Sequence, residues 1–297
     1  MATQEIRVED RAAAFNLPWK VARDEGLLAR EGLTVKFVPE GSTDITTEVD
    51  HRKVDSFQQH VVFEEGAVDL FNACEWGQVK RAQDSETGGV IVSKRPAVAV
   101  MGLYSSPKAG LLVPQDLRNV PIAVKFHTGS HYAVLQMLEG FMDRSEISVL
   151  QVGSPQTRYE ALANEQVVVA ALMEPWSTLA EVNGFNRVIE AFYYGSDIGS
   201  DAMDTETYAA LTRAIIEAVA RINSDKRKYL HYFIEEVPAR LGVLVPEDFT
   251  LSRLRFIEPT PYSKREFDKT YDWLVGLGLV DKDTPFEKLV DNRITVG

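Results

Sequence analysis

Cysteine is nearly absent from this sequence. Cys74 is the single cysteine among 297 residues, so no disulfide bond can form within the chain. The cysteine count therefore does not indicate an oxidising or a reducing compartment. Long apolar runs are missing too: none approaches the roughly 20 residues of a membrane-spanning helix, so we expect no membrane insertion. Basic residues are outnumbered, with 32 Lys and Arg against 44 Asp and Glu and a net charge of −12. Because phosphate binding needs clustered Lys and Arg, we expect no nucleic-acid partner.

The N-terminal residues lack the features of an export signal. A secretory signal has a basic start and an apolar stretch of roughly 7–15 residues, and residues 1–8 offer neither. As written, the sequence therefore predicts a cytoplasmic protein. If a signal peptide has been removed from it, the protein is periplasmic or extracellular.

Strand-like and helix-like segments alternate along the chain, which is typical of α/β proteins. The expected strands are residues 6–8, 33–38, 68–72, 90–101 with a break at Pro96, 121–126, 147–152, 167–173 and 187–192. The expected helices are residues 18–30, 45–65, 130–142, 157–164, 205–223, 227–237 and 263–277.

The alternation starts again after Pro107, which predicts two lobes. Lobe I takes residues 1–102 and 197–297, including a mainly helical C-terminal tail, and lobe II takes residues 103–196. The chain is expected to cross between the lobes near Gly102 and near residues 194–196. Since α/β sheets bind ligands at the carboxyl ends of their strands, we expect a ligand cleft between the lobes. The alternative is a single doubly wound sheet.

The first candidate site follows the strand at residues 68–72. Asn72, Cys74, Glu75 and Trp76 lie where this strand ends and would face the cleft. A thiol beside a carboxylate can act as nucleophile and base, although the carboxylate raises the thiol pKa and so weakens the nucleophile. The alternative is that Cys74 is a small buried hydrophobic residue.

The second candidate site is the turn after the strand at residues 121–126. His127, Thr128, Gly129 and Ser130 lead into a helix whose free backbone N–H groups, together with the hydroxyls, suit an anionic ligand group. His131 is a candidate general base. The alternative is a plain helix N-cap with solvated histidines.

The third candidate site pairs carboxylates with indoles. Glu174 and Trp176 leave the strand at residues 167–173, Glu75 and Trp76 repeat the pairing in the first half, and Trp19 follows the first strand. A carboxylate accepts N–H bonds from a flat nitrogen-bearing ring while an indole stacks on it. We therefore expect such a ring there, with any acid group of the ligand at residues 128–130. The alternative is that the Trp side chains fill the lobe cores.

The remaining candidates are weaker. Ser42 and Asp44 follow the second strand and either hydrogen-bond the ligand or cap the next helix. His127 and His131 have an i, i+4 spacing but straddle a turn, so we expect no metal site. The chain shows no phosphate-binding glycine loop, nucleophile elbow or dinucleotide fingerprint, and we expect no cofactor.

An ordered series of short motifs extends over nearly the whole chain. They are NLPWKVARDEGLL at residues 16–28, EGLTV at 31–35, GAVDL at 66–70, DL at 116–117, PIAV at 121–124, TGS at 128–130, EPW at 174–176, YDWL at 271–274 and LVDNR at 289–293. The series resembles type II periplasmic solute-binding proteins, in the branch of aliphatic-sulfonate, taurine and pyrimidine-precursor binders and hydroxymethylpyrimidine-phosphate synthases. The resemblance implies a two-lobed venus-flytrap fold, but fold alone does not decide activity.

This chain lacks residues that two kinds of enzyme in this fold group use for their known reactions. The pyrimidine synthases of this branch carry a pyridoxal-phosphate lysine just after the third strand, where this chain has Asn72, and a cysteine cluster in the tail, where this chain has none. A sulfinate desulfinase of the same fold has a cysteine before its first helix, where this chain has Phe15 and Asn16, and Asn16 becomes a candidate ligand residue.

The resemblance implies a small-molecule binding protein like the substrate-binding components of ABC importers, with an ABC permease as partner if it is exported. The predicted ligand is a small nitrogen-bearing aromatic or heterocyclic molecule or an organic acid. The alternative is a cytosolic lyase, hydrolase or decarboxylase acting on a small aromatic or heterocyclic acid. In that case Cys74, Glu75 and His131 are the predicted catalytic residues.

Overall fold

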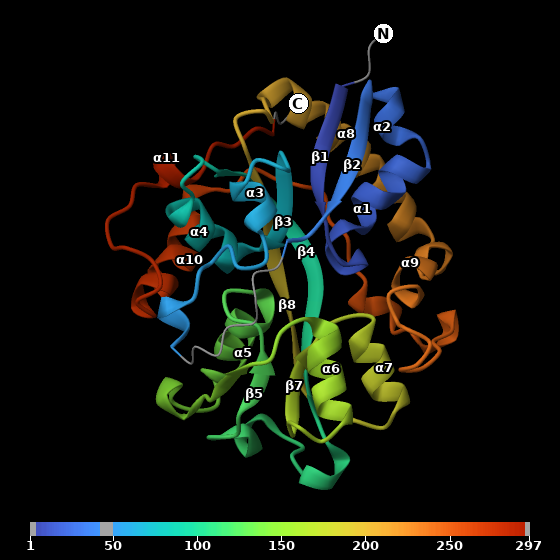
Figure 1. Ribbon diagram of the computed structural model, residues 1–297, viewed down its shortest axis with the longest axis vertical. Coiled ribbons are helices and arrows are strands. Elements are labelled where there is room, and N and C mark those ends of the chain that lie inside the picture. The colour runs from blue at the N-terminus through green and yellow to red at the C-terminus, as the bar shows by residue number, and fades with distance from the viewer. Residues whose placement is uncertain (1–3, 42–49, 295–297) are drawn as a thin grey trace.

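The computed structural model of the protein describes residues 4–41 and 50–294. Within these residues a single mixed sheet contains eight strands in the order β2-β1-β3-β8-β4-β7-β5-β6. The strands are β1 (Gln4–Asp10), β2 (Leu33–Pro39), β3 (Leu70–Cys74), β4 (Val90–Ser105), β5 (Ile122–Val124), β6 (Val149–Gln151), β7 (Val169–Leu172) and β8 (Asn186–Gly199). Figure 1 shows β1, β2 and β3 in the upper half of the molecule and β5 and β7 in the lower half.

The long strands β4 and β8 run through both halves and hold them together (Figure 1). β8 pairs with β3 at residues 195–199, and β4 pairs with β7 at residues 102–105, so each half attaches to a different stretch of this central pair. The register between β4 and β8 shifts between Arg95 and Ala99, around Pro96. Proline cannot donate a ladder hydrogen bond, which explains the break predicted there. The sheet is thus continuous, but its continuity depends on two strands.

Helices cover both halves of the sheet. They are α1 (Ala13–Asp24), α2 (Leu27–Arg30), α3 (Val61–Glu64), α4 (Glu75–Asp84), α5 (Gly129–Leu138), α6 (Pro155–Ala163), α7 (Trp176–Val182), α8 (Thr205–Ser224), α9 (His231–Ile234), α10 (Lys264–Gly276) and α11 (Phe286–Leu289). In the upper half α1 and α2 pack against α8, and α4 packs against β8 and α10. In the lower half α6 packs against β7 and α7, while α5 packs against β8. The C-terminal tail is mainly helical, as predicted, and lies in the upper half in Figure 1.

Three predicted helices differ from those observed. The helix predicted at residues 227–237 is a 3-10 turn at Lys226–Tyr229 followed by the short α9. α1 begins at Ala13, before the predicted start at residue 18, and Pro18 lies inside it. The small residues Ala13 and Ala14 are buried, so packing extends the helix upstream of the proline. The helix predicted at residues 45–65 is represented, among residues 50–65, by a 3-10 turn at His51–Lys53 and by the short α3. Residues 42–44, where Ser42 and Asp44 were predicted to bind ligand, lie outside the described residues.

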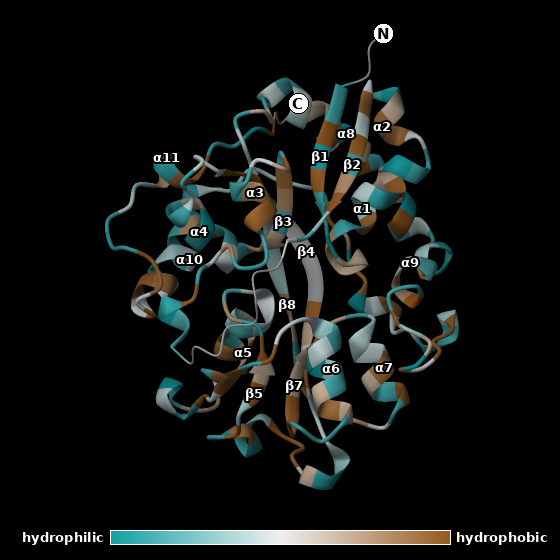
Figure 2. Ribbon diagram, viewed as in Figure 1, coloured by the Kyte–Doolittle hydropathy of each residue, from teal (hydrophilic) through white to brown (hydrophobic). Residues whose placement is uncertain are grey.

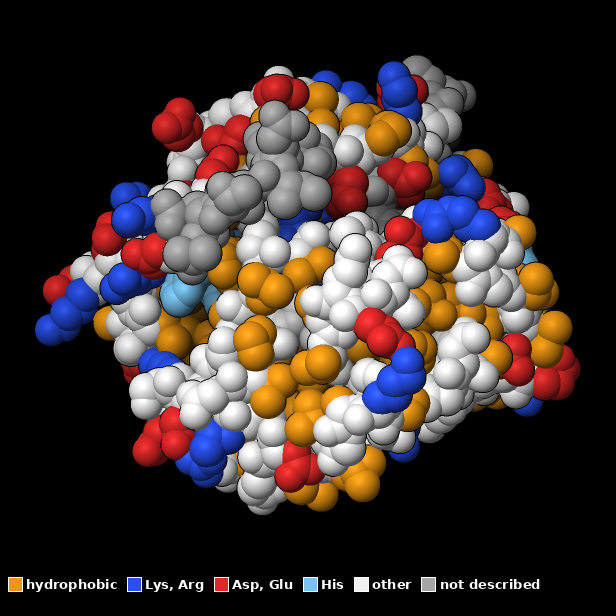
Figure 3. All heavy atoms as spheres, turned by 60° about the horizontal axis from the view of Figure 1, so that its bottom comes forward, with side chains coloured by type: hydrophobic (Ala, Val, Ile, Leu, Met, Phe, Trp, Pro, Cys, Tyr) orange, Lys and Arg blue, Asp and Glu red, His pale blue; other side chains and the backbone are white. Residues whose placement is uncertain are grey.

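In Figure 2, β7 is coloured as largely hydrophobic, whereas the visible face of α6 is mainly hydrophilic or neutral. On the face in Figure 3, the described Lys and Arg side chains lie among Asp and Glu side chains. Among the helices of the described residues, none has the length and apolar character needed to cross a membrane.

Candidate functional site

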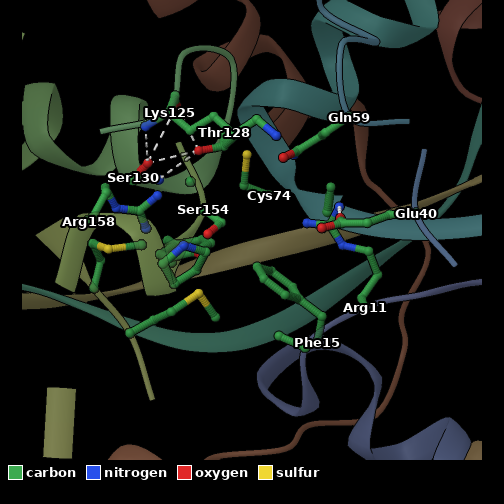
Figure 4. A pocket seen from close by; sticks show the side chains of 17 residues that line it. Arg11, Phe15, Glu40, Gln59, Cys74, Lys125, Thr128, Ser130, Ser154 and Arg158 are labelled. Atoms are coloured by element: carbon green, nitrogen blue, oxygen red, sulfur yellow. Dashed lines mark hydrogen bonds and ion pairs between the residues drawn. The ribbon is translucent and has the colours of Figure 1, made fainter. Parts of the chain in front are cut away.

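A cavity lies where the two halves meet, beside the crossing strands (Figure 4). Its empty space is roughly 600 Å³, a figure that includes space open to solvent. Its lining residues are Arg11, Ala12, Phe15, Glu40, Gln59, Ala73, Cys74, Met101, Lys125, Thr128, Gly129, Ser130, Ser154, Pro155, Arg158, Met173 and Tyr193.

Many of these residues follow the carboxyl end of a strand. Arg11 directly follows β1, Glu40 follows β2, Lys125 follows β5 and Met173 follows β7, while Cys74 is the last residue of β3. Strands β1 and β2 are parallel, as are β5 and β7, so their carboxyl ends meet at common edges of the sheet. The cavity therefore lies at the carboxyl-end position predicted for an α/β ligand site.

The turn from β5 to α5 is shaped by its own side chains. The Thr128 hydroxyl donates to the Lys125 carbonyl over 2.8 Å, and the Lys125 backbone N–H donates to the Ser130 hydroxyl over 2.9 Å. His127 has φ 56°, a left-handed conformation that redirects the chain before the helix. A Cβ atom on Gly129 would lie 2.5 Å from the Tyr193 hydroxyl oxygen, so only glycine fits there. The turn thus brings the N-terminus of α5 to the cavity wall.

Arg158 on α6 brings a buried positive charge to the cavity. Its side chain is 2% exposed, and its Nε donates to the Ala171 carbonyl over 2.7 Å. A second nitrogen donates to the Gly153 carbonyl. Burial lowers the pKa of Arg158 to about 9, which still leaves it charged at neutral pH. Among the described residues no carboxylate forms an ion pair with it, so neutral carbonyls alone hold this guanidinium.

Lys125 adds a second positive charge to the same wall. Burial lowers its pKa to about 8; the charge of Glu40 raises the pKa, while the charges of Arg11 and Arg158 lower it. Within residues 4–41 and 50–294 its ammonium group has no carboxylate at ion-pair distance. At neutral pH the ammonium group is mostly protonated, so two cations that form no ion pair with a described carboxylate face the cavity.

Arg11 stands on the opposite wall of the cavity. Its guanidinium lies 5.3 Å from the centre of the Phe15 ring and forms an ion pair of 2.8 Å with Glu40. Behind it, Glu9 and His60 are fully buried, with 2.6 Å between the Glu9 Oε2 and the His60 Nδ1. Burial raises the pKa of Glu9 to about 8 and lowers the pKa of His60 well below its ordinary value. Both side chains are therefore mainly uncharged at neutral pH, and they offset little of the Arg11 charge.

Four predicted residues line the cavity: Cys74, Thr128, Gly129 and Ser130. Thr128 also caps α5, because its hydroxyl accepts from the Ser130 backbone N–H, so the N-cap alternative and the binding prediction describe the same residue. Burial raises the pKa of the Cys74 thiol, which keeps it protonated at neutral pH. A protonated thiol is a poor nucleophile.

Other predicted residues at the exit of β3 point away from the cavity. Asn72 donates to the buried Asp197 carboxylate over 2.7 Å. Glu75 accepts a hydrogen bond from Thr270. Trp76 packs among Tyr132, Tyr193 and Trp273 with ring centres 5.4–6.2 Å away. These side chains serve the packing of α4 and α10, and not the cavity wall.

The remaining predicted residues are also used inside the structure. Asn16 donates to the Glu9 carbonyl over 2.8 Å, and Trp19 lies under the Arg95 guanidinium at 4.5 Å. Trp176 packs against the ring of Tyr159, with centres 5.7 Å apart.

Glu174 and the two histidines are likewise buried off the cavity wall. Glu174 accepts from the Thr178 hydroxyl over 2.6 Å and lies 3.4 Å from Arg253. His127 contacts the His51 carbonyl through its Nε2 at 2.6 Å, and the His131 ring lies 4.9 Å from the His51 ring. Within the described residues, no group of three His, Cys, Asp or Glu side chains is placed to hold a metal ion.

The sequence patterns did not predict the charged residues of the cavity or the Ser154 hydroxyl. Arg11, Glu40 and Lys125 each follow a strand, and this position was a usable signal. Ser154 is the N-cap of α6 and accepts from the Thr157 backbone N–H over 3.1 Å, a pattern visible in the sequence Ser154-Pro155. Arg158 lies in the middle of α6, where no local pattern points to a ligand.

Comparisons with known proteins complete the picture of the fold. No protein-family model matches the sequence, and no similar sequence was found among curated proteins. Among solved structures, the alkanesulfonate-binding protein SsuA from Xanthomonas axonopodis pv. citri, bound to MOPS, superposes with a TM-score of 0.76 at 16% identity, covering 98% of this chain and 99% of that one. The periplasmic aliphatic sulphonate binding protein SsuA from Escherichia coli gives a TM-score of 0.71 at 14% identity, covering 96% and 97%.

An enzyme has the same fold. A cysteine-to-serine mutant of DSZB, in complex with biphenyl-2-sulfinic acid, gives a TM-score of 0.65 at 12% identity, covering 97% of this chain and 96% of that one. At these identities the likeness establishes architecture and not activity. The chain has the two-lobed α/β fold of type II periplasmic binding proteins, as its sequence predicts.

Proposed function

We propose that the protein binds a small organic acid in the cavity, with the acid group between Lys125, Arg158 and the N-terminus of α5. The observation that carries this proposal is the buried Arg158 guanidinium, which has no carboxylate partner among the described residues. Removing a charge from water costs several kcal/mol when nothing compensates it. A ligand anion at the cavity wall would supply that compensation.

Hydrogen-bond donors at the same wall suit an acid with several oxygens. Ser154 presents a hydroxyl at the start of α6, whereas the Thr128 hydroxyl at the start of α5 already donates to the Lys125 carbonyl, so the backbone N–H groups are the donors that α5 offers. Helix N-termini carry free N–H groups and a partial positive charge, so they attract anions. A sulfonate, with three oxygens, can use more of these donors than a carboxylate. The solved alkanesulfonate-binding neighbours support a sulfonate as the first class to test.

The proposed site narrows the class of ligands predicted from the sequence. The ring-binding part of that prediction requires Trp76 and Trp176 on the cavity wall, whereas both pack inside the lobes. Glu75 and Glu174 are occupied by Thr270 and Arg253. The organic-acid part is supported by the cations and donors at the cavity. The placement of the acid group at residues 128–130 is retained.

Binding involves two lobes in this proposal, with boundaries at residues 1–102 plus 197–297 and at residues 103–196. The cavity lies between walls contributed by both, so a ligand that contacts both would favour their closed arrangement. The role proposed is that of the substrate-binding component of an ABC importer, with a permease as partner if the protein is exported. A relation to hydroxymethylpyrimidine-phosphate synthases remains a prediction from sequence alone.

Catalysis is the second candidate function, and Cys74 on the cavity wall is the observation in its favour. The sequence prediction also requires Glu75 and His131, which do not line the cavity. The raised pKa of the Cys74 thiol argues against a nucleophile. Binding is therefore the better supported function.

Isothermal titration calorimetry with propanesulfonate and butanoate tests the proposal. Lys125→Met removes one cation and, within residues 4–41 and 50–294, no hydrogen bond of its side chain, and we expect the affinity for the bound acid to fall roughly tenfold or more. Arg158→Met should lower affinity further, although it also leaves two carbonyls without their donor. Arg240→Met is the matched control, because Arg240 forms an exposed ion pair with Glu160 on α6.

Two results of this titration would contradict the proposal. If neither sulfonates nor carboxylates bind at millimolar concentration to the folded protein, the cavity is not an acid-binding site. An equal loss of affinity in Arg240→Met would show that the cavity cations act only through overall charge.

A further inference from the structure

The cavity has a second polar end, opposite the Arg158 wall. Figure 4 shows Arg158, Ser130 and Lys125 on one side and Arg11 and Glu40 on the other. Gln59 joins this second end. The lining also contains the apolar or mainly apolar side chains of Phe15, Cys74, Met101, Met173 and Tyr193, and Figure 4 shows Cys74 between the two ends. A ligand that fills the cavity therefore meets a polar group at each end as well as apolar side chains.

Arg11 is built into this second end and is not a surface side chain. It is 9% exposed at the side chain, lies over the Phe15 ring, and contacts Glu40 through one nitrogen at 2.8 Å. Its Nε is buried and has no hydrogen-bond partner among the described residues. This nitrogen is enclosed by protein, so a ligand in the cavity would meet the guanidinium through the other Arg11 atoms that line the cavity.

The charges around Arg11 favour an acidic ligand group over an amine. Glu40 is the acid at this end, and its side chain is 44% exposed, so water screens its charge. The buried Glu9 behind Arg11 is mainly protonated at neutral pH, so Arg11 and the screened Glu40 are the charges of this end. The Lys125 ammonium belongs to the other end but still acts here, because Glu40 and Arg11 both influence its pKa. An ammonium group of a ligand would be repelled by both cations and attracted only by the screened Glu40, whereas a carboxylate would be attracted by both cations.

We infer that the preferred ligand is a short organic diacid, with one acid group at Lys125 and Arg158 and a second acid group at Arg11. Arg11 is then the specificity-determining residue for the second group. The guanidinium presents its N–H donors in a planar fork that matches a carboxylate. This inference rests on the proposed binding of an organic acid in the same cavity.

A matched ligand series tests the inference on the whole chain. Calorimetry compares alkanesulfonates of two to five methylenes with the sulfonates that carry a terminal carboxylate and with those that carry a terminal amine. At the best chain length we expect the sulfo-carboxylate to bind at least tenfold more tightly than the plain sulfonate, and the amine to bind more weakly than either.

Three variants separate specificity from structure. Arg11→Gln should reduce the ratio of sulfo-carboxylate affinity to plain-sulfonate affinity to about one. Glu40→Gln removes the acid that competes for Arg11, so it should raise that ratio, an effect that a merely structural role would not produce. Arg7→Gln is the control on the same strand, because Arg7 pairs with Asp69 and does not line the cavity, and the ratio should not change.

The possible outcomes distinguish the two proposals. If the plain sulfonate binds as tightly as the sulfo-carboxylate at every length, the diacid inference is overturned while acid binding stands. Tighter binding of the amine would assign the second end to Glu40 and also overturn the inference. If no member of the series binds, the proposed function itself fails. A ratio that falls in Arg11→Gln and rises in Glu40→Gln supports the inference.

Discussion

The exits of β3 and β5 occupy equivalent places in the two halves, yet they use their polar residues in opposite ways. At the exit of β5, Thr128 and Ser130 line the cavity. At the exit of β3, Asn72 and Glu75 form hydrogen bonds inside the upper half, and only Ala73 and Cys74 reach the cavity. Equal topology therefore does not give equal exposure to a ligand.

The difference follows from the length of the connection to the next helix. β3 ends at Cys74 and α4 begins at Glu75, so no turn separates them, and every residue of β3 is buried. β5 ends at Val124 and α5 begins at Gly129, with the left-handed His127 in between. The extra turn lets hydroxyls and N–H groups point at the cavity. A direct strand-to-helix junction leaves its side chains on the packed faces of the two elements.

Trp76→Ala should give the largest effect in this comparison. Its ring fills the space between α4, α5 and α10 through contacts with Tyr132, Tyr193 and Trp273. Truncating a buried aromatic ring leaves a cavity and typically costs about 3–5 kcal/mol of unfolding free energy. Urea denaturation followed by circular dichroism measures the change.

The matched change at the other exit is Ser130→Ala. It removes a hydroxyl but no buried ring, so its cost in unfolding free energy should be about 1 kcal/mol. If Trp76→Ala is as mild as Ser130→Ala, then Trp76 is not part of the core, and the contrast between the exits is wrong.

The sequence predicts the location of the site better than its residues. The alternation of strands and helices places a cleft at the strand ends, and Thr128, Gly129 and Ser130 line the cavity as a helix-start pattern would. A local pattern succeeds here because the N-cap hydrogen bonds are made within a few residues. Arg158 illustrates the opposite case, because its side chain reaches the cavity only through the packing of α6 on β7.

Trp76 shows why side-chain direction was not predictable. An indole beside a carboxylate at a strand end fits a ligand site or a packed core equally well, and the partners Tyr132, Tyr193 and Trp273 lie 56 to 197 residues farther along the chain. The continuity of the sheet through β4 and β8 was also not evident, because each long strand reads as an ordinary short strand in either half. Long-range packing decides both features.

Asn72→Ala and Thr128→Ala test the same contrast at smaller magnitude. Asn72 donates to the buried Asp197 carboxylate, so its loss should cost about 1.5–3 kcal/mol of unfolding free energy, with affinity for an alkanesulfonate unchanged within twofold. Thr128→Ala removes the N-cap of α5 and should cost about 1 kcal/mol. It should also weaken sulfonate binding severalfold, because Thr128 lines the cavity.

Urea denaturation and calorimetry on the same preparations measure the unfolding free energy and the sulfonate affinity of each variant. If Asn72→Ala loses affinity at a temperature where the variant is fully folded, the β3 exit is part of the binding site after all. If the affinity of Thr128→Ala is unchanged, the β5 exit is not part of the binding site.

The pH dependence of binding should give the smallest effect, and it compares the two walls of the cavity in one titration. Burial lowers the pKa of Lys125 on the β5 wall to about 8 and raises the pKa of Glu9 behind the Arg11 wall to about 8. Below pH 8, Lys125 is charged and Glu9 is neutral, which suits an anion. As the pH rises through 8, Lys125 loses its positive charge and Glu9 gains a negative one, so both changes oppose anion binding.

A bound anion should therefore raise both pKa values, and binding above pH 7 should take up protons. Linkage limits the loss of affinity to about tenfold per pH unit for each proton taken up. Calorimetry with an alkanesulfonate from pH 6 to 9.5, in two buffers of different ionisation enthalpy, measures affinity and proton uptake together. The pKa of His60 is lowered well below its ordinary value, so this group adds nothing in that window, whereas Arg158, with its pKa lowered to about 9, adds to the loss of affinity at the upper end of the window. Glu9→Gln cannot ionise and should make the decline above pH 8 shallower, whereas an affinity that is flat or rising between pH 7 and 9.5 would show that neither group senses the ligand.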